Sequence, residues 1–118
     1  MKKILIKNAR IVNEGSVTEG DLYIEGERIA RIDNHISQKD NNTQIIDAAG
    51  RYLLPGLIDD QVHFREPGLT HKANIGTESR AAVAGGITSY IEQPNTVPPA
   101  VTLELLEDKY NIAGRTSI

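Results

Sequence analysis

Residues 54–68 read LPGLIDDQVHFREPG, an apolar run that ends in polar and charged side chains and then a Pro-Gly turn. If a strand continues through this stretch, Asp59, Gln61, His63 and Arg65 project to the same side, because side chains alternate across a strand. That side then carries a carboxylate, an amide, an imidazole and a guanidinium. Polar side chains at the carboxyl end of a barrel strand are where chemistry takes place in (β/α)8 enzymes.

Each of these side chains also has an ordinary structural interpretation. A single histidine after a strand is more often a surface or capping residue than a metal ligand, and an arginine alone is usually a solvated charge. Asp59 could simply satisfy backbone groups of the loop. However, four convergent polar side chains after an apolar run are costly without a purpose, and this favours a functional site.

A second polar segment, QPNTVPP at residues 93–99, follows the next predicted strand. Because both strands would end at the same barrel face, we expect this segment to lie beside the first one. Asn95 offers a donor and an acceptor from one amide, and the flanking prolines stiffen the loop. Taken alone, the segment is also typical of an ordinary Pro-Asn turn, and that is the simpler interpretation.

Helical periodicity covers residues 74–85, between the two polar segments, and Gly85-Gly86 supplies a stop. The packing face of this helix is predicted to hold Ile75, Ser79, Ala82 and Val83. Residues 87–93 then predict a strand that ends at Pro94.

A second helix is predicted over residues 102–110, with Thr102 as its N-cap. Its apolar stripe consists of Leu103, Leu106 and Tyr110. Gly114 is expected to break the chain before a third strand that begins at residues 116–118. Strand, helix, strand and helix in this order imply parallel strands with right-handed crossovers.

Residues 1–53 predict a separate unit of short strands and turns. Turns are expected at residues 13–16 and 26–27, and the polar residues 34–43 predict a surface loop. The predicted strands, in chain order, cover residues 4–6, 11–12, 21–25, 28–33 and 44–47. Together they predict a small antiparallel sheet, followed by an α/β domain over residues 54–118.

The 118-residue chain has a net charge of −3 and no cysteine. The absence of cysteine excludes a disulfide framework and thiolate metal ligands. The chain has no Lys/Arg run and no stripe of aromatic and basic residues, which argues against a nucleic-acid partner. The first apolar run is too short for a signal peptide, and no stretch approaches the ~20 apolar residues of a membrane span. We therefore expect a cytoplasmic protein without a membrane partner.

Four segments together resemble the dihydroorotase family of the amidohydrolase superfamily, in order and in spacing. They are PGLID at 55–59, HFREPG at 63–68, AAVAGGIT at 81–88 and PNT at 94–96. The resemblance covers essentially the whole chain, and HFREPG is its most specific part. It implies the first strands and helices of a (β/α)8 metal-dependent hydrolase barrel, preceded by part of a small antiparallel β-sandwich.

The resemblance also implies a reversible, zinc-dependent ring reaction that interconverts N-carbamoyl-L-aspartate and dihydroorotate, as a step of pyrimidine biosynthesis. His63 matches the second histidine of the family's His-x-His metal motif. Arg65 matches the residue that grips the substrate carboxylate, a task suited to a planar fork of donors, and Asn95 matches a further substrate contact. Asp59 matches the acidic residue that precedes the metal motif and supports the ligands.

The chain departs from the family's pattern at Gln61, where the first histidine of the motif is expected. A neutral amide oxygen is a poorer zinc ligand than imidazole, so one zinc ion is favoured over two. Some dihydroorotases resemble this chain in the same Asp-Gln-Val-His variant, and Gln61 therefore does not by itself imply loss of activity.

The chain is short for the implied barrel, which needs about 250 residues. We therefore expect the catalytic residues and the remaining metal ligands beyond Ile118, and no activity from this chain alone. Strands that lack neighbours predict self-association or a homo-oligomer. Two alternatives stay open: a related cyclic-amide hydrolase such as dihydropyrimidinase or allantoinase, and a catalytically dead homologue that acts as a structural partner.

Overall fold

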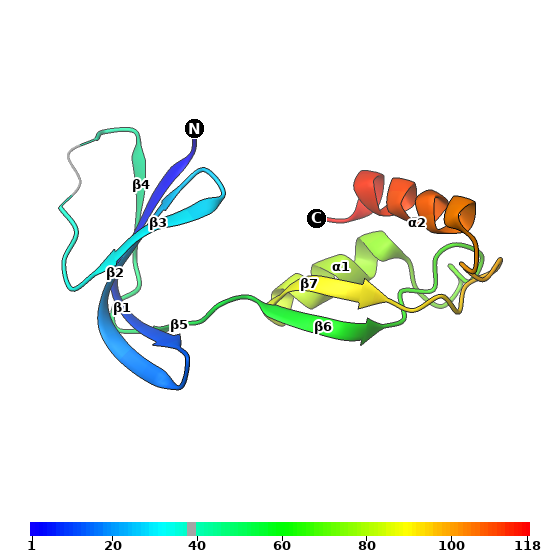
Figure 1. Ribbon diagram of the computed structural model, residues 1–118, viewed down its shortest axis with the longest axis horizontal. Helices are drawn as coiled ribbons and strands as arrows, with labels where there is room; N and C mark the ends of the chain where they lie inside the picture. Colours follow the sequence, from blue (N-terminus) through cyan, green and yellow to red (C-terminus); the bar gives the residue numbers. More distant parts are fainter. Residues whose placement is uncertain (38–39) are drawn as a thin grey trace. The chain divides into compact units, whose positions relative to one another are not determined.

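The computed structural model describes residues 1–37 and 40–118 and divides the chain into two compact units, Met1–Pro55 and Gly56–Ile118. Within these residues the first unit is built from strands, and the second combines two strands with two helices (Figure 1). The chain is therefore mixed α/β, as the sequence predicts. None of the helices in the described residues has the length and apolar character needed to cross a membrane.

The first unit begins with three antiparallel strands: β1 (Lys3–Asn13), β2 (Ser16–Glu25) and β3 (Arg28–Asp33). The turn between β1 and β2 lies where it is predicted, with Glu14 at φ 47° and Gly15 at φ 74°. Two central residues with positive φ give a two-residue turn the twist that a hairpin requires. Two short strands are predicted where β1 runs as one, because an irregularity between Ile6 and Ala9 interrupts its register without ending it.

The prediction of a purely antiparallel sheet is wrong, because β4 (Thr43–Asp47) and β5 (Tyr52–Leu53) both pair parallel to β1. The sheet order is β3-β2-β1-β4, so the chain returns past two strands before it pairs again. A tight hairpin enforces antiparallel pairing, whereas a longer connection permits parallel pairing. The predicted loop over residues 34–43 provides that connection, although residues 38–39 lie outside the described part of the chain.

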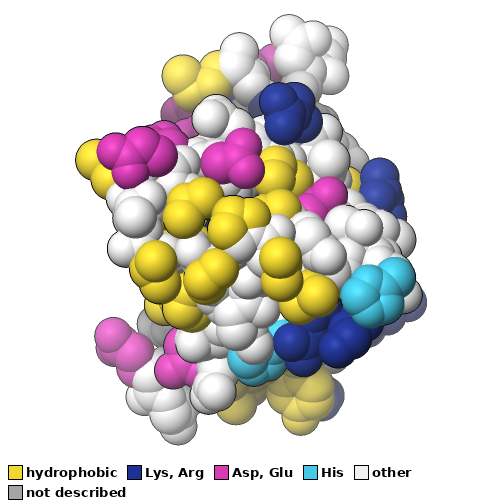
Figure 2. Space-filling model, turned by 90° about the vertical axis from the view of Figure 1, so that its right-hand side faces the viewer, with side chains coloured by type: hydrophobic (Ala, Val, Ile, Leu, Met, Phe, Trp, Pro, Cys, Tyr) yellow, Lys and Arg dark blue, Asp and Glu magenta, His cyan; other side chains and the backbone are white. Residues whose placement is uncertain are grey.

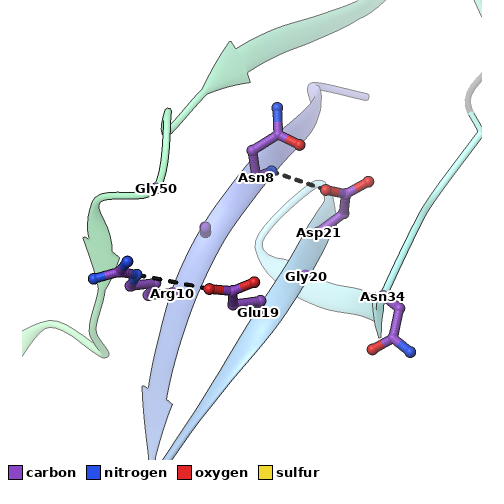
Figure 3. Close-up of a pocket in the computed structure, with 8 residues that line it drawn as sticks. Asn8, Arg10, Glu19, Gly20, Asp21, Asn34 and Gly50 are labelled. Atoms are coloured by element: carbon purple, nitrogen blue, oxygen red, sulfur yellow. Dashed lines mark hydrogen bonds and ion pairs between the residues drawn. The ribbon is translucent and has the colours of Figure 1, made fainter.

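Asp21 stabilises the sheet of the first unit from inside. Its side chain is buried and accepts hydrogen bonds from the backbone N–H groups of Asn8 and Ile36, both at 2.9 Å. Figure 3 shows the contact with Asn8 in a pocket lined by residues of β1 and β2. Burial opposes ionisation of this carboxyl, but the two backbone donors outweigh it and hold the pKa of Asp21 below its ordinary value.

The second unit pairs β6 (Leu57–Val62) in parallel with β7 (Ile87–Glu92), as predicted. The helices are α1 (Ile75–Ala84) and α2 (Leu103–Thr116). A single apolar cluster joins the strands to both helices; its buried members are Val62, Phe64 and Ile75, packed against Ala82, Tyr90, Ile112 and Ala113. Both helices therefore pack on the same face of the strand pair.

Helix α1 begins where the sequence predicts, at the N-cap Asn74, whose side chain accepts the N–H of Thr77 at 2.9 Å. Ile75 and Ser79 are buried as expected, whereas the predicted core residue Val83 is 49% exposed. The start of α1 is the part that approaches α2: a Cβ at Gly76 would lie 3.2 Å from the Thr116 carbonyl oxygen. Val83 lies two turns further on, beyond that contact.

Helix α2 differs more from its prediction. It starts after Thr102 as expected, but it continues through Gly114 to Thr116, where a break and a third strand are predicted. One glycine inside a helix costs only about 1 kcal/mol, and the packing of neighbouring Ile112 and Ala113 in the core offsets that cost. The predicted apolar stripe, Leu103, Leu106 and Tyr110, is exposed, and the buried residue of α2 is Lys109.

Several large apolar side chains of the second unit are exposed, among them Leu57, Ile58, Ile91, Val101, Leu103 and Tyr110. Figure 2 shows hydrophobic side chains gathered in one area of the surface, with acidic side chains above it and histidine and basic side chains at its lower right. Exposed apolar surface of this kind supports association with other protein surfaces. Self-association itself stays a prediction.

Candidate functional site

His63, Arg65 and Asn95 lie just beyond the carboxyl ends of the two strands of the second unit, whereas Asp59 and Gln61 lie within β6. β6 ends at Val62, directly before His63, and β7 ends at Glu92, three residues before Asn95. Parallel strands end at the same edge, and the structure brings these two residues together: His63 Nδ1 lies 3.1 Å from Asn95 Oδ1. An amide oxygen only accepts, so His63 Nδ1 carries the proton and donates it. In the neutral ring, Nε2 then has a free lone pair.

Side chains alternate as predicted from Gln61 to His63, although the pairing of β6 with β7 shifts register between Asp59 and Val62. Val62 and Phe64 are buried against Ile75 of α1, whereas Gln61 and His63 are exposed on the other side. Asp59 is half-buried, and its Oδ1 accepts the Gln61 backbone N–H at 3.1 Å. The carboxylate of Asp59 thus helps to hold the backbone that carries Gln61.

The strand does not continue through Arg65, and this part of the prediction is wrong. β6 ends at Val62, and Arg65 has φ 67°, in the left-handed region. The backbone turns because the Phe64 N–H leaves the strand ladder and donates to Glu92 Oε1 at 3.1 Å. Arg65 is half-buried, and among the described residues its guanidinium makes no hydrogen bond or ion pair.

The two loops that follow β6 and β7 pack directly on each other. The Val97 N–H donates to the Pro67 carbonyl oxygen at 3.1 Å. Gly68 has φ 83°, and a Cβ at this position would overlap the Val97 carbonyl group. Only glycine combines this backbone conformation with this close approach. The Pro-Gly turn therefore fixes the position of the loop that carries Asn95.

Glu66 has a structural role that sequence reasoning missed. Its Oε2 accepts the backbone N–H of Ile75 at 2.9 Å, and Ile75 is the first residue of α1. A carboxylate is favourable there because the first N–H groups of a helix lack partners within the helix. A signal was available in the sequence, because Glu66 precedes a predicted helix start by a short loop.

The ion pair between Glu92 and Lys109 was also missed. It joins the end of β7 to α2, and both side chains are almost completely buried. Burial lowers the pKa of the Lys109 ammonium below its ordinary value. The burial of Lys109 was not expected, because a lysine side chain is almost never fully buried unless it is paired.

The donor chemistry of the site fits one ligand of a zinc centre. His63 Nε2 is unpaired in the tautomer that the contact with Asn95 requires, and imidazole nitrogen is a common zinc ligand. In the part of the chain that the structure describes, no three His, Cys, Asp or Glu side chains are arranged to hold a metal ion. Among the described residues, His63 thus fits one position of a metal site, and any further ligands would have to come from outside them.

A family model described as dihydro-orotase-like matches residues 50–117, more than half of the chain. The chain belongs to this family. It is 44% identical over 120 residues to the dihydroorotase of Methanosarcina acetivorans, covering 100% of this chain and 25% of the relative. It is 40% identical over 117 residues to a dihydroorotase of Streptococcus thermophilus, covering 98% of this chain and 27% of the relative.

Solved structures that resemble this dihydro-orotase-like chain include hydantoinases. The L-hydantoinase (dihydropyrimidinase) from Arthrobacter aurescens matches with a TM-score of 0.89 and 33% identity, over 97% of this chain and 25% of that one. The D-hydantoinase (dihydropyrimidinase) from Thermus sp. matches with a TM-score of 0.77 and 36% identity, over 93% and 24%. The chain thus spans about a quarter of the length of the relatives it matches.

Proposed function

We propose that this chain forms the first two strand–helix units of a dihydroorotase barrel, which interconverts N-carbamoyl-L-aspartate and dihydroorotate. The observation that carries the proposal is the contact between His63 Nδ1 and Asn95 Oδ1 at 3.1 Å. It joins the residue matched to the metal motif to the residue matched to substrate binding. Both lie at the strand ends, where barrel enzymes carry their chemistry.

Arg65 is suited to bind the carboxylate of the substrate. Its guanidinium makes no hydrogen bond or ion pair with the described residues, so its fork of donors is available to an anion. Asn95 uses its oxygen for His63 and keeps its amide N–H donors for the same ligand. Two donor groups from neighbouring loops would therefore bind one carboxylate of dihydroorotate.

His63 would bind zinc through Nε2, together with ligands from outside the described residues. A bound zinc ion polarises an amide carbonyl and lowers the pKa of a bound water. Gln61 is exposed beside His63 and offers only a neutral amide oxygen, so we propose one zinc ion and not two. Asp59 would keep Gln61 in place through the backbone contact described above.

A hydantoinase or dihydropyrimidinase activity is the second candidate, favoured by the structural match to the Arthrobacter enzyme at a TM-score of 0.89. The two functions differ in the charge of the substrate. Dihydroorotate carries a carboxylate on its ring, whereas dihydrouracil and hydantoin do not. Arg65 and Asn95 favour the charged substrate, because a guanidinium facing an uncharged ring would gain less.

The test is a substrate comparison with a complete barrel that contains this chain. Hydrolysis of dihydroorotate, dihydrouracil, hydantoin and allantoin would be measured in parallel at equal metal content. We expect the highest kcat/KM for dihydroorotate and no turnover by residues 1–118 alone. A preference for an uncharged ring would support the hydantoinase candidate, and no turnover of any of the four would support the inactive structural partner.

A further inference from the structure

A buried ion pair lies directly behind the two loops that carry the candidate site. Glu92 is the last residue of β7, and Lys109 lies in α2. The side chains of Lys109 and Glu92 are only 8% and 9% exposed. Lys109 Nζ contacts Glu92 Oε2 and also donates to the Gln93 carbonyl oxygen at 2.9 Å. The lysine therefore holds both the side chain and the backbone at the end of β7.

The other oxygen of Glu92 reaches the neighbouring strand. Glu92 Oε1 accepts the N–H of Phe64 at 3.1 Å, one step beyond the last ladder bond, in which the Gln93 N–H donates to the Val62 carbonyl oxygen at 3.0 Å. Phe64 is buried, so its N–H needs a partner within the protein. The Glu92 carboxylate thus takes the place of a backbone carbonyl acceptor at the point where β7 ends, shortly before Pro94.

Phe64 and Gln93, the two residues whose backbone Glu92 and Lys109 hold, lie close in sequence to each predicted site residue of the two loops. Phe64 lies between His63 and Arg65, and Gln93 lies two residues before Asn95. A buried ion pair is weak evidence for stability, because removing two charges from water costs about as much as their attraction returns. Apolar side chains of similar size would fill the same space. Apolar side chains could not, however, accept the hydrogen bond from the Phe64 N–H, which requires an acceptor at position 92.

We propose that Glu92 is a positioning residue for the site: its carboxylate, held by Lys109, fixes the backbone of Phe64 and thereby the relative placement of His63, Arg65 and Asn95. The inference rests on the site of the proposed function, but not on the identity of its substrate. Glu92 does not face the ligand, because its side chain points to α2 on the opposite side of the strand pair from His63.

Two double variants separate positioning from stability. E92L/K109M replaces the ion pair with apolar side chains and removes the acceptor for Phe64. E92Q/K109M removes the same two charges but keeps an amide oxygen at position 92. E107Q, on the exposed surface of α2, controls for the loss of one negative charge. Each variant of the 118-residue chain would be compared with the parent by urea unfolding and by NMR.

The informative readouts are the hydrogen-exchange rate of the Phe64 amide and the backbone shifts of His63 and Asn95. We expect both double variants to fold, with a lower unfolding midpoint for E92L/K109M than for E92Q/K109M, because E92L leaves the buried Phe64 N–H without an acceptor. In E92L/K109M, exchange at Phe64 should rise about tenfold or more, and the shifts of His63 and Asn95 should move. E92Q/K109M should restore the Phe64 exchange rate and the His63 shifts to parent values. A change at Asn95 that both double variants share reports the loss of the Lys109 bond to the Gln93 carbonyl oxygen. Neither readout needs a substrate, so the failure of the proposed function would leave them unaffected.

Three results would overturn the proposal. One is an E92L/K109M chain with parent-like Phe64 exchange and parent-like shifts at His63 and Asn95. Another is that the E92Q/K109M variant folds and the E92L/K109M variant does not, because the acceptor at position 92 would then be a requirement of folding. The third is failure of both double variants to fold, which would make the charge pair itself that requirement.

Discussion

His63 and Asn95 come from different loops, and the His63 Nδ1–H donates to Asn95 Oδ1 across 3.1 Å. This one contact selects the tautomer of the ring. An acceptor at Nδ1 keeps the proton there and leaves Nε2 as the nitrogen that can bind a metal. Asn95 would therefore serve the metal site as well as the substrate.

Removing the acceptor should release the tautomer of His63. In N95A, we expect the Nδ1–H form to lose its preference, and long-range ¹H–¹⁵N NMR of the neutral ring in the 118-residue chain would measure this. In a complete barrel, zinc affinity should fall about 10–100-fold, as is typical when the partner of a histidine ligand is lost. T77A, which alters the cap of α1, is the control. A ring that stays in the Nδ1–H form in N95A would contradict the prediction.

Zinc content should respond in opposite directions to changes at Gln61 and His63. In a complete barrel, Q61H should raise zinc stoichiometry or affinity, because imidazole is a better ligand than a neutral amide. H63A should lose both zinc and activity. Mass spectrometry of bound metal, with H71A as a matched histidine control, would measure these changes. Parent-like zinc content and rate in H63A would show that this strand does not carry the metal.

Arg65 should act mainly on the binding of the charged substrate. In R65K, we expect KM for dihydroorotate to rise about tenfold or more with a smaller change in kcat, because an ammonium cannot reproduce two parallel bonds to a carboxylate. Arg115, exposed in the last turn of α2, provides the control R115K. Steady-state kinetics at several substrate concentrations would separate the two parameters. A fall in kcat alone would argue that Arg65 contacts the reacting amide instead.

Two glycines should respond differently to the same substitution. In G68A, the added Cβ meets the Val97 carbonyl group at φ 83°, so we expect a loss of about 1–3 kcal/mol in the free energy of unfolding. In G114A, nothing lies within 4 Å of the added Cβ inside α2, so we expect a gain of about 0.5–1 kcal/mol. Urea unfolding of both variants would measure the contrast. Equal effects would show that the two loops do not pack as described.

The first unit should lose stability in acid through Asp21. The folded pKa of this carboxyl lies below its ordinary value of 3.8, because two backbone donors outweigh burial. Its contribution is therefore present above the unfolded pKa and is lost as the pH falls through the folded value. D21N should cost about 1–3 kcal/mol at neutral pH and should flatten the dependence below pH 4. E27Q is the exposed control, and thermal unfolding followed from pH 7 to pH 2 would show whether the two variants differ.

The sequence by itself determined the features that depend on a few neighbouring residues. The turn at Glu14 and Gly15, the start of α1 at Asn74, the N-cap Thr102 and the alternation of Val62 with His63 all follow from local conformational preference or from a period of two or 3.6. The two site loops could be found as well, because polar residues followed each apolar strand. Their side chains and spacing also carried the family resemblance.

The tertiary structure decided what depends on partners distant in the sequence. Parallel pairing of β4, the turn at Arg65, the burial of Lys109 and the exposure of the Leu103 stripe each depend on which surface covers a residue. Periodicity shows which side chains share a face, but it does not show which face another element covers. A helix with apolar residues on two sides can pack with either side against its neighbours. Glu92 shows the same limit: its bonds to Phe64 and Lys109 join residues 28 and 17 positions away, and no local pattern encodes them.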